Sequence, residues 1–153
     1  MSNLKEGLTL SVVSYSRGID PTSGVPLNPH WSFQVNNKQT RTLFFQLKGQ
    51  TGQYYYGGEE KQILMKSQSR DKMVRIGAVP EDRVGELDVL LGTIPLRNDV
   101  GANAMTEWGI HRGCRAWCLD ALAPLKNAGF IDEGVTPESI KAALKSDWDT
   151  SAN

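Results

Sequence analysis

Short stretches in which apolar and polar residues alternate fill the first half of the chain. Residues 8–15 alternate in this way and are rich in β-branched side chains, which is typical of a β-strand. Residues 30–35 form the next predicted strand, residues 36–40 have the composition of a hairpin turn, and residues 41–49 supply the partner strand. Similar runs follow in "QYYYG", "QILMKS" and "KMVRIGAV". The pattern predicts antiparallel strands joined by local turns.

The apolar period changes to that of a helix in the second half. Residues 80–94 begin with Pro and two acidic residues and carry apolar side chains at helical spacing. The clearest helix begins at Cys114 and carries one apolar stripe, formed by Cys114, Trp117, Cys118, Ala121, Leu122 and Leu125. Pro124 is expected to kink this helix or to end its regular part, and Gly129 is the predicted C′ residue.

A last helix is predicted near the C-terminal end, with Thr136 as its N-cap and Pro137 at its first position. The tail, residues 149–153, is expected to fray. Strands followed by helices indicate an α+β fold in which an antiparallel β-sheet packs against helices. We expect a single domain over residues 1–153, with a core of about residues 7–148.

The charge balance narrows the classes of partner. Seventeen basic and seventeen acidic side chains cancel, which gives no electrostatic reason to expect nucleic acid or an anionic membrane as the main partner. The apolar runs are too short to cross a bilayer, so no integral membrane association is expected. The first residues lack the layout of a secretory signal, so we expect a cytoplasmic protein with reduced thiols. A small-molecule substrate is the expected partner, and the oligomeric state stays open.

The two cysteines, Cys114 and Cys118, are four residues apart and share one helix face. A disulfide between them would strain the helix, so two free thiols are expected. Because Gly113 precedes Cys114, this cysteine lies in the first helical turn, where unpaired N–H groups and the helix dipole favour a thiolate. Cys118, one turn further into the helix, lacks this stabilisation and is expected to pack as a small hydrophobic residue. Arg115 and Asp120 fall on the polar side and are assigned to solvent.

Simpler interpretations of these residues stay open. A cysteine on an apolar stripe is commonly just buried, and a histidine at a strand start, such as His30, commonly makes a local hydrogen bond. His30 and His111 with Cys114 and Cys118 could also supply four zinc ligands. The spacing lacks the paired C-x2-C of structural zinc sites, and a core of this size does not need one. We therefore expect no metal and no cofactor.

The segments "HWSFQV" and "GCRAWC" together resemble the circularly permuted papain-like thiol fold of the lecithin retinol acyltransferase family, which is related to bacterial cell-wall peptidases of the NlpC type. Small fungal proteins with "HW" early and "NCQxW" late also look similar. In that family an "HW" strand carries the general base and an "NCEHFV"-like segment opens the nucleophile helix. The resemblance covers about residues 27–131 and implies that His30 is the base and Cys114 the nucleophile.

The chain departs from the family pattern at two positions. The family carries a second histidine on the following strand, where the equivalent here is Gln46, which accepts a hydrogen bond but cannot offset positive charge. Gly113 stands where the family has Asn. In this fold, residues 16–29 and 95–112 would wall the pocket. The candidate substrate-binding residues are Trp31, Trp108, Tyr55 and His111, with Tyr54 and Tyr56 as further aromatic candidates.

The resemblance implies a cysteine-dependent enzyme, of the thiol hydrolase or acyltransferase type, acting on a small acyl-type substrate. The missing second histidine favours a first alternative, a non-hydrolytic isomerase or cyclase of small-molecule metabolism that reuses the same pocket. A second alternative is a catalytically inactive binding module, in which Cys114 would be buried and unreactive.

Overall fold

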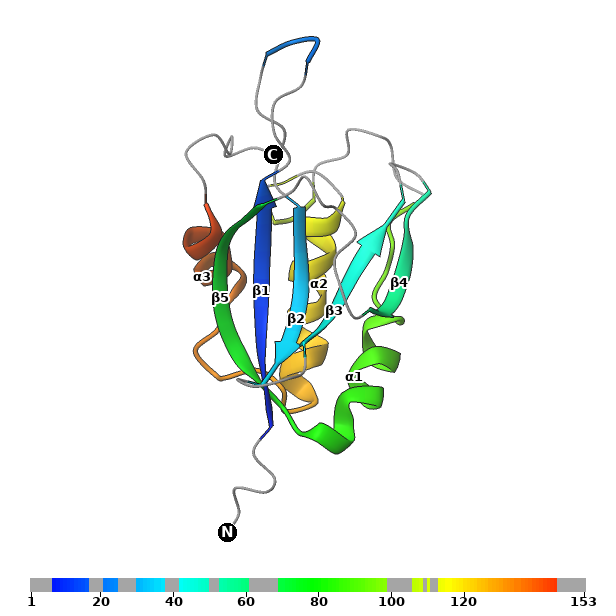
Figure 1. The fold of residues 1–153 in the computed structure, drawn as a ribbon, viewed down its shortest axis with the longest axis vertical. Helices are drawn as coiled ribbons and strands as arrows, with labels where there is room; N and C mark the ends of the chain where they lie inside the picture. The colour runs from blue at the N-terminus through cyan, green and yellow to red at the C-terminus, as the bar shows by residue number, and fades with distance from the viewer. Residues whose placement is uncertain are drawn as a thin grey trace.

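Five antiparallel strands form one sheet, against which the helices pack (Figure 1). The computed structural model describes residues 7–16, 21–24, 30–37, 42–49, 53–60, 69–98, 106–108, 110 and 113–145. The strands are β1 (Leu8–Ser16), β2 (His30–Asn36), β3 (Thr42–Lys48), β4 (Tyr55–Glu60) and β5 (Ser69–Val79). They are ordered β4-β3-β2-β1-β5.

The helices are α1 (Val84–Leu91), α2 (Cys114–Asn127) and α3 (Pro137–Leu144), and a 3-10 turn, η2 (Glu81–Arg83), precedes α1. The predicted α+β class is confirmed.

The first three predicted strands agree with β1, β2 and β3 to within one residue at each end. The tyrosine run was placed less well, because β4 begins at Tyr55 and continues through two glycines to Glu60. The predicted "KMVRIGAV" strand is the later part of the longer β5. The predicted "QILMKS" strand (62–67) and the frayed tail (149–153) lie outside the described residues.

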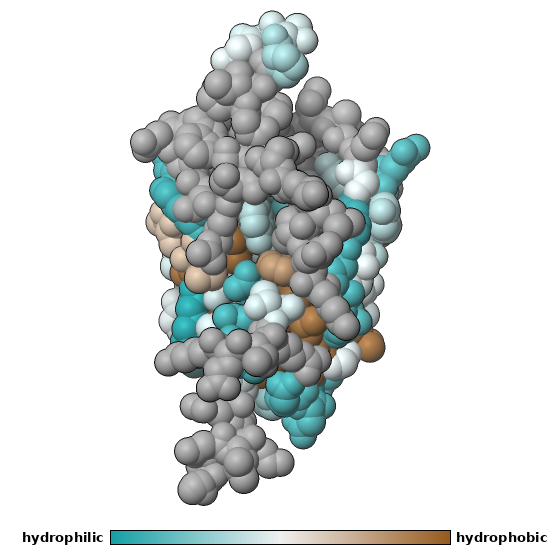
Figure 2. Space-filling model, viewed as in Figure 1, coloured by the Kyte–Doolittle hydropathy of each residue, from teal (hydrophilic) through white to brown (hydrophobic). Residues whose placement is uncertain are grey.

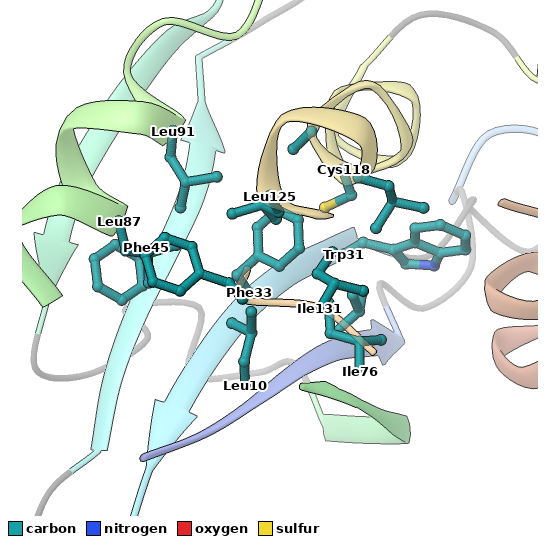
Figure 3. Close-up of a cluster of buried hydrophobic side chains, with 14 of the residues drawn as sticks. Leu10, Trp31, Phe33, Phe45, Ile76, Leu87, Leu91, Cys118, Leu125 and Ile131 are labelled. Atoms are coloured by element: carbon teal, nitrogen blue, oxygen red, sulfur yellow. The ribbon is translucent and has the colours of Figure 1, made fainter. Parts of the chain in front are cut away.

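One continuous hydrophobic core joins the sheet to all three helices. In the view of Figure 1, α2 lies behind the sheet, and its apolar stripe packs on β2 and β3. The Phe33 ring meets Trp117 edge-on, with 5.7 Å between ring centroids. Figure 3 shows Cys118 and Leu125 of α2 above Phe33, with Leu87 and Leu91 of α1 beside them. The apolar stripe of α2 therefore fixes the helix, and with it Cys114, against the sheet.

The end of α2 corrects one prediction. Of the two outcomes expected at Pro124, the end of the regular helix is wrong, because α2 continues to Asn127. Gly129 takes a positive φ of 87°, and the Phe130 N–H donates back to the Leu125 carbonyl at 3.0 Å. This confirms Gly129 as the C′ residue. The C-terminal cap and the buried Leu125 hold the last turn in place although Pro124 has no N–H to donate.

Helix α1 is shorter than predicted, and helix α3 begins where it was predicted to begin. The predicted helix over 80–94 is divided into η2 and the eight-residue α1. The N-cap of α3 is confirmed, since the Thr136 hydroxyl accepts from the Ser139 N–H at 3.0 Å while the Ser139 hydroxyl accepts from the Thr136 N–H at 3.0 Å. This reciprocal pair is a capping box, and Pro137 follows it.

The described surface is mixed in character. Figure 2 shows hydrophobic residues interspersed with hydrophilic ones where the face is coloured. Large hydrophobic side chains that are exposed include Tyr55, Met73 and Val89, from three separate elements. In the part of the chain that the structure describes, none of the helices has the length and apolar character needed to cross a membrane.

Candidate functional site

Strands β2 and β3 pair at only one of their ends. Their pairing runs from Asn36↔Thr42 to Phe33↔Phe45 and stops there. Toward the top of Figure 1 the two strands diverge, and α2 begins at that same end of the sheet. His30, at the start of β2, and Gln46, near the end of β3, both lie beyond the last pair. The two strands therefore bring these residues to the start of α2.

His30 and Gln46 are bonded to each other in a buried position. The His30 Nε2 atom lies 2.7 Å from the Gln46 Oε1 atom, and the two residues are 8% and 3% exposed. Across β1 and β2, Tyr15 pairs with His30, with 6.2 Å between ring centroids. Since Nε2 is engaged by Gln46, the other ring nitrogen, Nδ1, is the one available to a further partner.

Gln46 lies at an irregularity of the sheet. The register between β3 and β4 shifts between Phe45 and Leu47, opposite the glycine pair of β4. Gly58 takes a positive φ of 79°, which an ordinary side chain would strain. Such bulges commonly re-aim a side chain next to a functional site.

Gln46 has a second partner on β4. Its Nε2 atom donates to the Glu60 Oε1 atom at 3.1 Å, and the Lys48 ammonium pairs with the other oxygen of the same carboxylate. Glu60 was not predicted from the sequence, because a glutamate in a strand carries no local signal of this role. The structure thus shows a hydrogen-bonded series that runs from His30 through Gln46 to Glu60 and ends at Lys48.

Cys114 is the first residue of α2 and is only half-buried. Gly113 precedes it with a φ of 142°, a backbone conformation that favours glycine. A Cβ at Gly113 would lie 3.3 Å from the Tyr54 hydroxyl, so this phenol covers the start of the helix. The first turn of a helix offers backbone N–H groups that have no acceptor within the helix. Cys114 therefore lies beside a group of N–H donors and next to Tyr54.

The surroundings of Cys114 favour its thiolate. Burial by itself would raise the pKa of the thiol. The positive charge and hydrogen bond of His30, the backbone N–H of Trp31 and the charge of Arg115 together outweigh burial, and they lower the pKa of Cys114 from 9.0 to about 6. For Cys118, one turn further along, burial raises the pKa, and the negative charges at Cys114 and Asp120 add to this effect. Both thiols are free, but the pKa of Cys114 is lowered and the pKa of Cys118 is raised.

The predicted substrate-binding residues lie in different places. The Trp31 indole is 2% exposed and belongs to the hydrophobic core below α2 (Figure 3), while its backbone is hydrogen-bonded to Cys114. Tyr55 is 55% exposed on β4, where it pairs with Lys48. Tyr54 lies against the start of α2, and the Tyr56 ring packs on Trp117 of the same helix, with 5.7 Å between ring centroids. His111 lies outside the described residues.

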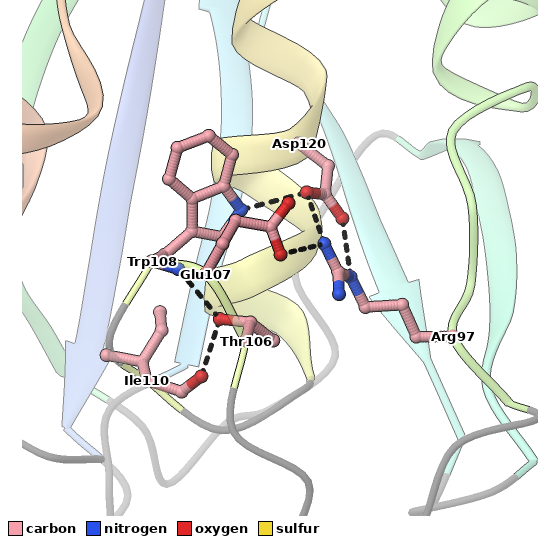
Figure 4. A network of polar contacts seen from close by, with 6 residues as sticks. All are labelled: Arg97, Thr106, Glu107, Trp108, Ile110 and Asp120. Atoms are coloured by element: carbon pink, nitrogen blue, oxygen red, sulfur yellow. Dashed lines mark hydrogen bonds and ion pairs between the residues drawn. The ribbon is translucent and has the colours of Figure 1, made fainter.

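Trp108 belongs to a polar network on the side of α2 (Figure 4). Its indole N–H donates to the Asp120 Oδ1 atom at 2.8 Å. The Arg97 guanidinium donates to both oxygens of Asp120, each at 2.8 Å, and also to Glu107 at 3.0 Å. Trp108 therefore holds a loop against the helix in the structure.

This network shows that the assignment of Asp120 and Arg115 to solvent was wrong. The Asp120 side chain is only 10% exposed, and Arg115 is 6% exposed. For Asp120 the physical reason is that Arg97 and Trp108 bind its carboxylate on the side of α2 that the helical pattern leaves polar. A charged residue on a helix is buried in such a case because it is paired.

Within the described residues, no group of three or more His, Cys, Asp or Glu side chains converges as a metal-binding cluster. Comparisons of the chain with protein-family models, with curated proteins and with solved structures gave no match.

Proposed function

We propose that this protein is a cysteine-dependent enzyme of the thiol hydrolase or acyltransferase type, which acts on a small acyl-type substrate. Cys114 is the nucleophile, His30 its base, and Gln46 the residue that orients the imidazole. The observation that carries the proposal is the series Cys114–His30–Gln46 at the start of α2, in which the cysteine has a pKa of about 6 and is only half-buried.

The fold assignment that belongs to this proposal is the circularly permuted papain-like arrangement. Two observations support it. The strand that carries the base precedes the helix that carries the nucleophile, and that helix packs on the sheet next to the base strand. The nucleophile also stands at a helix N-terminus, which is a common way of stabilising a catalytic thiolate.

The mechanism follows from the atoms in place. His30 takes the thiol proton, and the Cys114 thiolate attacks the acyl carbon, so that a C–S bond forms. The negative charge that develops on the acyl oxygen is held by backbone N–H groups of the first turn of α2. As the bond to the leaving group breaks, the His30 imidazolium gives its proton to that group. Water, or an acceptor hydroxyl or amine, then attacks the thioester, loses its proton to His30 and releases Cys114.

One observation favours the isomerase or cyclase alternative. Gln46 is neutral, so it orients the imidazole without offsetting its positive charge as a carboxylate would. An enzyme that moves a proton without forming an acyl-enzyme could use His30 and Cys114 as an acid–base pair. This alternative predicts a reactive Cys114 that never carries an acyl group.

Trapping of the acyl-enzyme tests the proposal. The protein is mixed with p-nitrophenyl esters of increasing acyl length, the burst of p-nitrophenolate is recorded, and the modified residue is identified by peptide mass mapping. We expect a burst of up to one equivalent and an acyl group on Cys114. Cys114→Ala and His30→Ala should abolish both signals, and Cys118→Ala is the matched control that should retain them, since Cys118 is buried in the core.

Two outcomes would contradict acyl chemistry. A burst that persists in Cys114→Ala would show that the esters react elsewhere. A Cys114 that is alkylated readily near pH 6 and yet takes no acyl group from any ester would refute the acyl-transfer proposal in favour of the acid–base alternative.

A further inference from the structure

We propose that Glu60 is a positioning residue, which fixes the amide orientation of Gln46 and through it the tautomer of His30. The inference rests on the proposed function and deepens it, because it adds a residue of β4 to the site. It stands on the two hydrogen bonds of Gln46, one to His30 at 2.7 Å and one to Glu60 at 3.1 Å.

The Glu60 carboxylate determines which end of the Gln46 amide faces it. An ionised Glu60 can only accept hydrogen bonds, so the group that Gln46 turns toward it must be the amide NH2. The amide oxygen of Gln46 then faces His30, and since this oxygen can only accept, the His30 Nε2 atom must carry a proton. In the neutral imidazole the Nδ1 atom is consequently free of a proton. Nδ1 is thus the basic nitrogen, available to Cys114.

The two ends of a glutamine amide have nearly the same shape, so the packing around Gln46 alone does not determine which end faces His30. With the amide reversed, Gln46 would donate to the Nε2 atom of His30. That bond requires Nε2 without a proton, which places the proton of the neutral ring on Nδ1. His30 could not then take the thiol proton through the nitrogen that faces it.

Lys48 pairs with the oxygen of Glu60 that Gln46 leaves open. The lysine ammonium pairs with the Oε2 atom of Glu60, while Gln46 bonds to Oε1, so each carboxylate oxygen has its own donor. The side chains of Lys48 and Glu60 are 26% and 17% exposed. The other ionisable groups near Glu60 are Glu59, which is exposed, and Tyr56, whose pKa is raised by burial, by its hydrogen bond to Asp88 and by the nearby glutamates. Tyr56 therefore stays protonated, and Lys48 is the cation that faces the carboxylate.

The tautomer is measured directly by long-range 1H–15N NMR of the histidine rings. The protein carries Cys114→Ala, so that no thiolate pairs with the ring, and the pH is set above the pKa of the imidazole. Signals that are missing in a His30→Ala spectrum belong to His30. We expect the Nε2–H form with Glu60 in place, and in Glu60→Gln a shift to Nδ1–H or to a mixture of both forms.

Two control variants change the charge near Gln46 but leave the Glu60 acceptor of its amide in place. Glu59→Gln removes the same charge from the neighbouring residue and should leave the Nε2–H form unchanged, because Glu59 is not bonded to Gln46 in the structure. Lys48→Met should also retain it, because the carboxylate alone is enough to orient the amide. Glu60→Thr, which suits a strand and removes the acceptor, repeats the test if Glu60→Gln does not fold.

Alkylation of Cys114 at pH 6, with the cysteine restored, gives a second readout. The loss of one orienting hydrogen bond predicts a rate about tenfold lower in Glu60→Gln, and Glu59→Gln should stay within about twofold of the parent. An unchanged Nε2–H tautomer in both Glu60→Gln and Glu60→Thr would overturn the role of Glu60. This result would leave acyl transfer untouched, whereas a tautomer switch in a protein that forms no acyl-enzyme would keep the positioning role and refute acyl transfer.

Discussion

The ionisation of Cys114 gives the most direct test of the site, because it depends on His30 and not on any choice of substrate. The perturbation is the substitution His30→Ala, and the assay is the rate of alkylation of Cys114 by iodoacetamide between pH 4 and pH 10, followed by peptide mapping. Cys118 serves as an internal control, since it is 1% exposed and should not react in the folded protein.

The expected magnitude follows from the pKa of about 6. At pH 6 about half of Cys114 is thiolate, against about 0.1% for a thiol at the ordinary value of 9.0, an excess of about 500-fold. A less basic thiolate is also a weaker nucleophile, and a Brønsted coefficient of about 0.45 over this difference reduces the gain by about 20-fold. The net prediction is that Cys114 reacts about 20-fold faster than an ordinary thiol at pH 6.

At high pH the order should reverse. At pH 9 about half of the ordinary thiol is ionised, and its more basic thiolate should make it react about tenfold faster than Cys114, a ratio that approaches about 20-fold at higher pH. The two rate profiles therefore cross, which a simple difference in access cannot produce, since access changes the rate by the same factor at every pH.

Removal of His30 takes away both its positive charge and its hydrogen bond to the thiolate, while burial of the sulfur remains. The midpoint of the profile should therefore rise from near 6 toward or above 9.0 in His30→Ala. A midpoint that stays near 6 without His30 would refute the Cys–His pair. A Cys114 that reacts only after unfolding would refute the nucleophile itself.

Two predictions concern stability, each measured by urea unfolding. Asp120→Asn removes the charge from a half-buried network of three hydrogen bonds and should cost about 2 kcal/mol, whereas Glu107→Gln, at an exposed side chain, should cost less than about 0.5 kcal/mol. Gly77→Ala would place a Cβ 1.9 Å from the Phe130 carbonyl oxygen and should cost about 3 kcal/mol, while Gly85→Ala, with nothing within 4 Å, should add about 0.5 to 1 kcal/mol. Equal losses within either pair would contradict the packing described for it.

The elements that the sequence predicted best are those whose side chains face one core. Strands β1 to β3 alternate because their apolar residues belong to the one core that also holds the stripe of α2, and the start of α2 follows from this stripe and from Gly113. The burial of Asp120 and Arg115 was not predicted. For Asp120 it depends on Arg97 and Trp108, which are more than ten residues away in the chain, and no local period encodes such contacts.

The site itself was predictable only in part, and the dipeptide His30–Trp31 shows why. Neighbours in a strand point to opposite faces, so the two side chains cannot share one pocket. The structure places the Trp31 indole in the core, while its backbone N–H reaches Cys114 and the His30 ring turns to Gln46. The side chains near the Cys114 thiol come from the ends of β2 and β3 that are no longer paired. The register of the sheet determines where this pairing stops. The same register brings Glu60 of β4 to Gln46, a contact that joins residues 14 positions apart across a bulge. A motif can therefore name a nucleophile and a base, but the groups that orient the base come from strand pairing and require the folded structure.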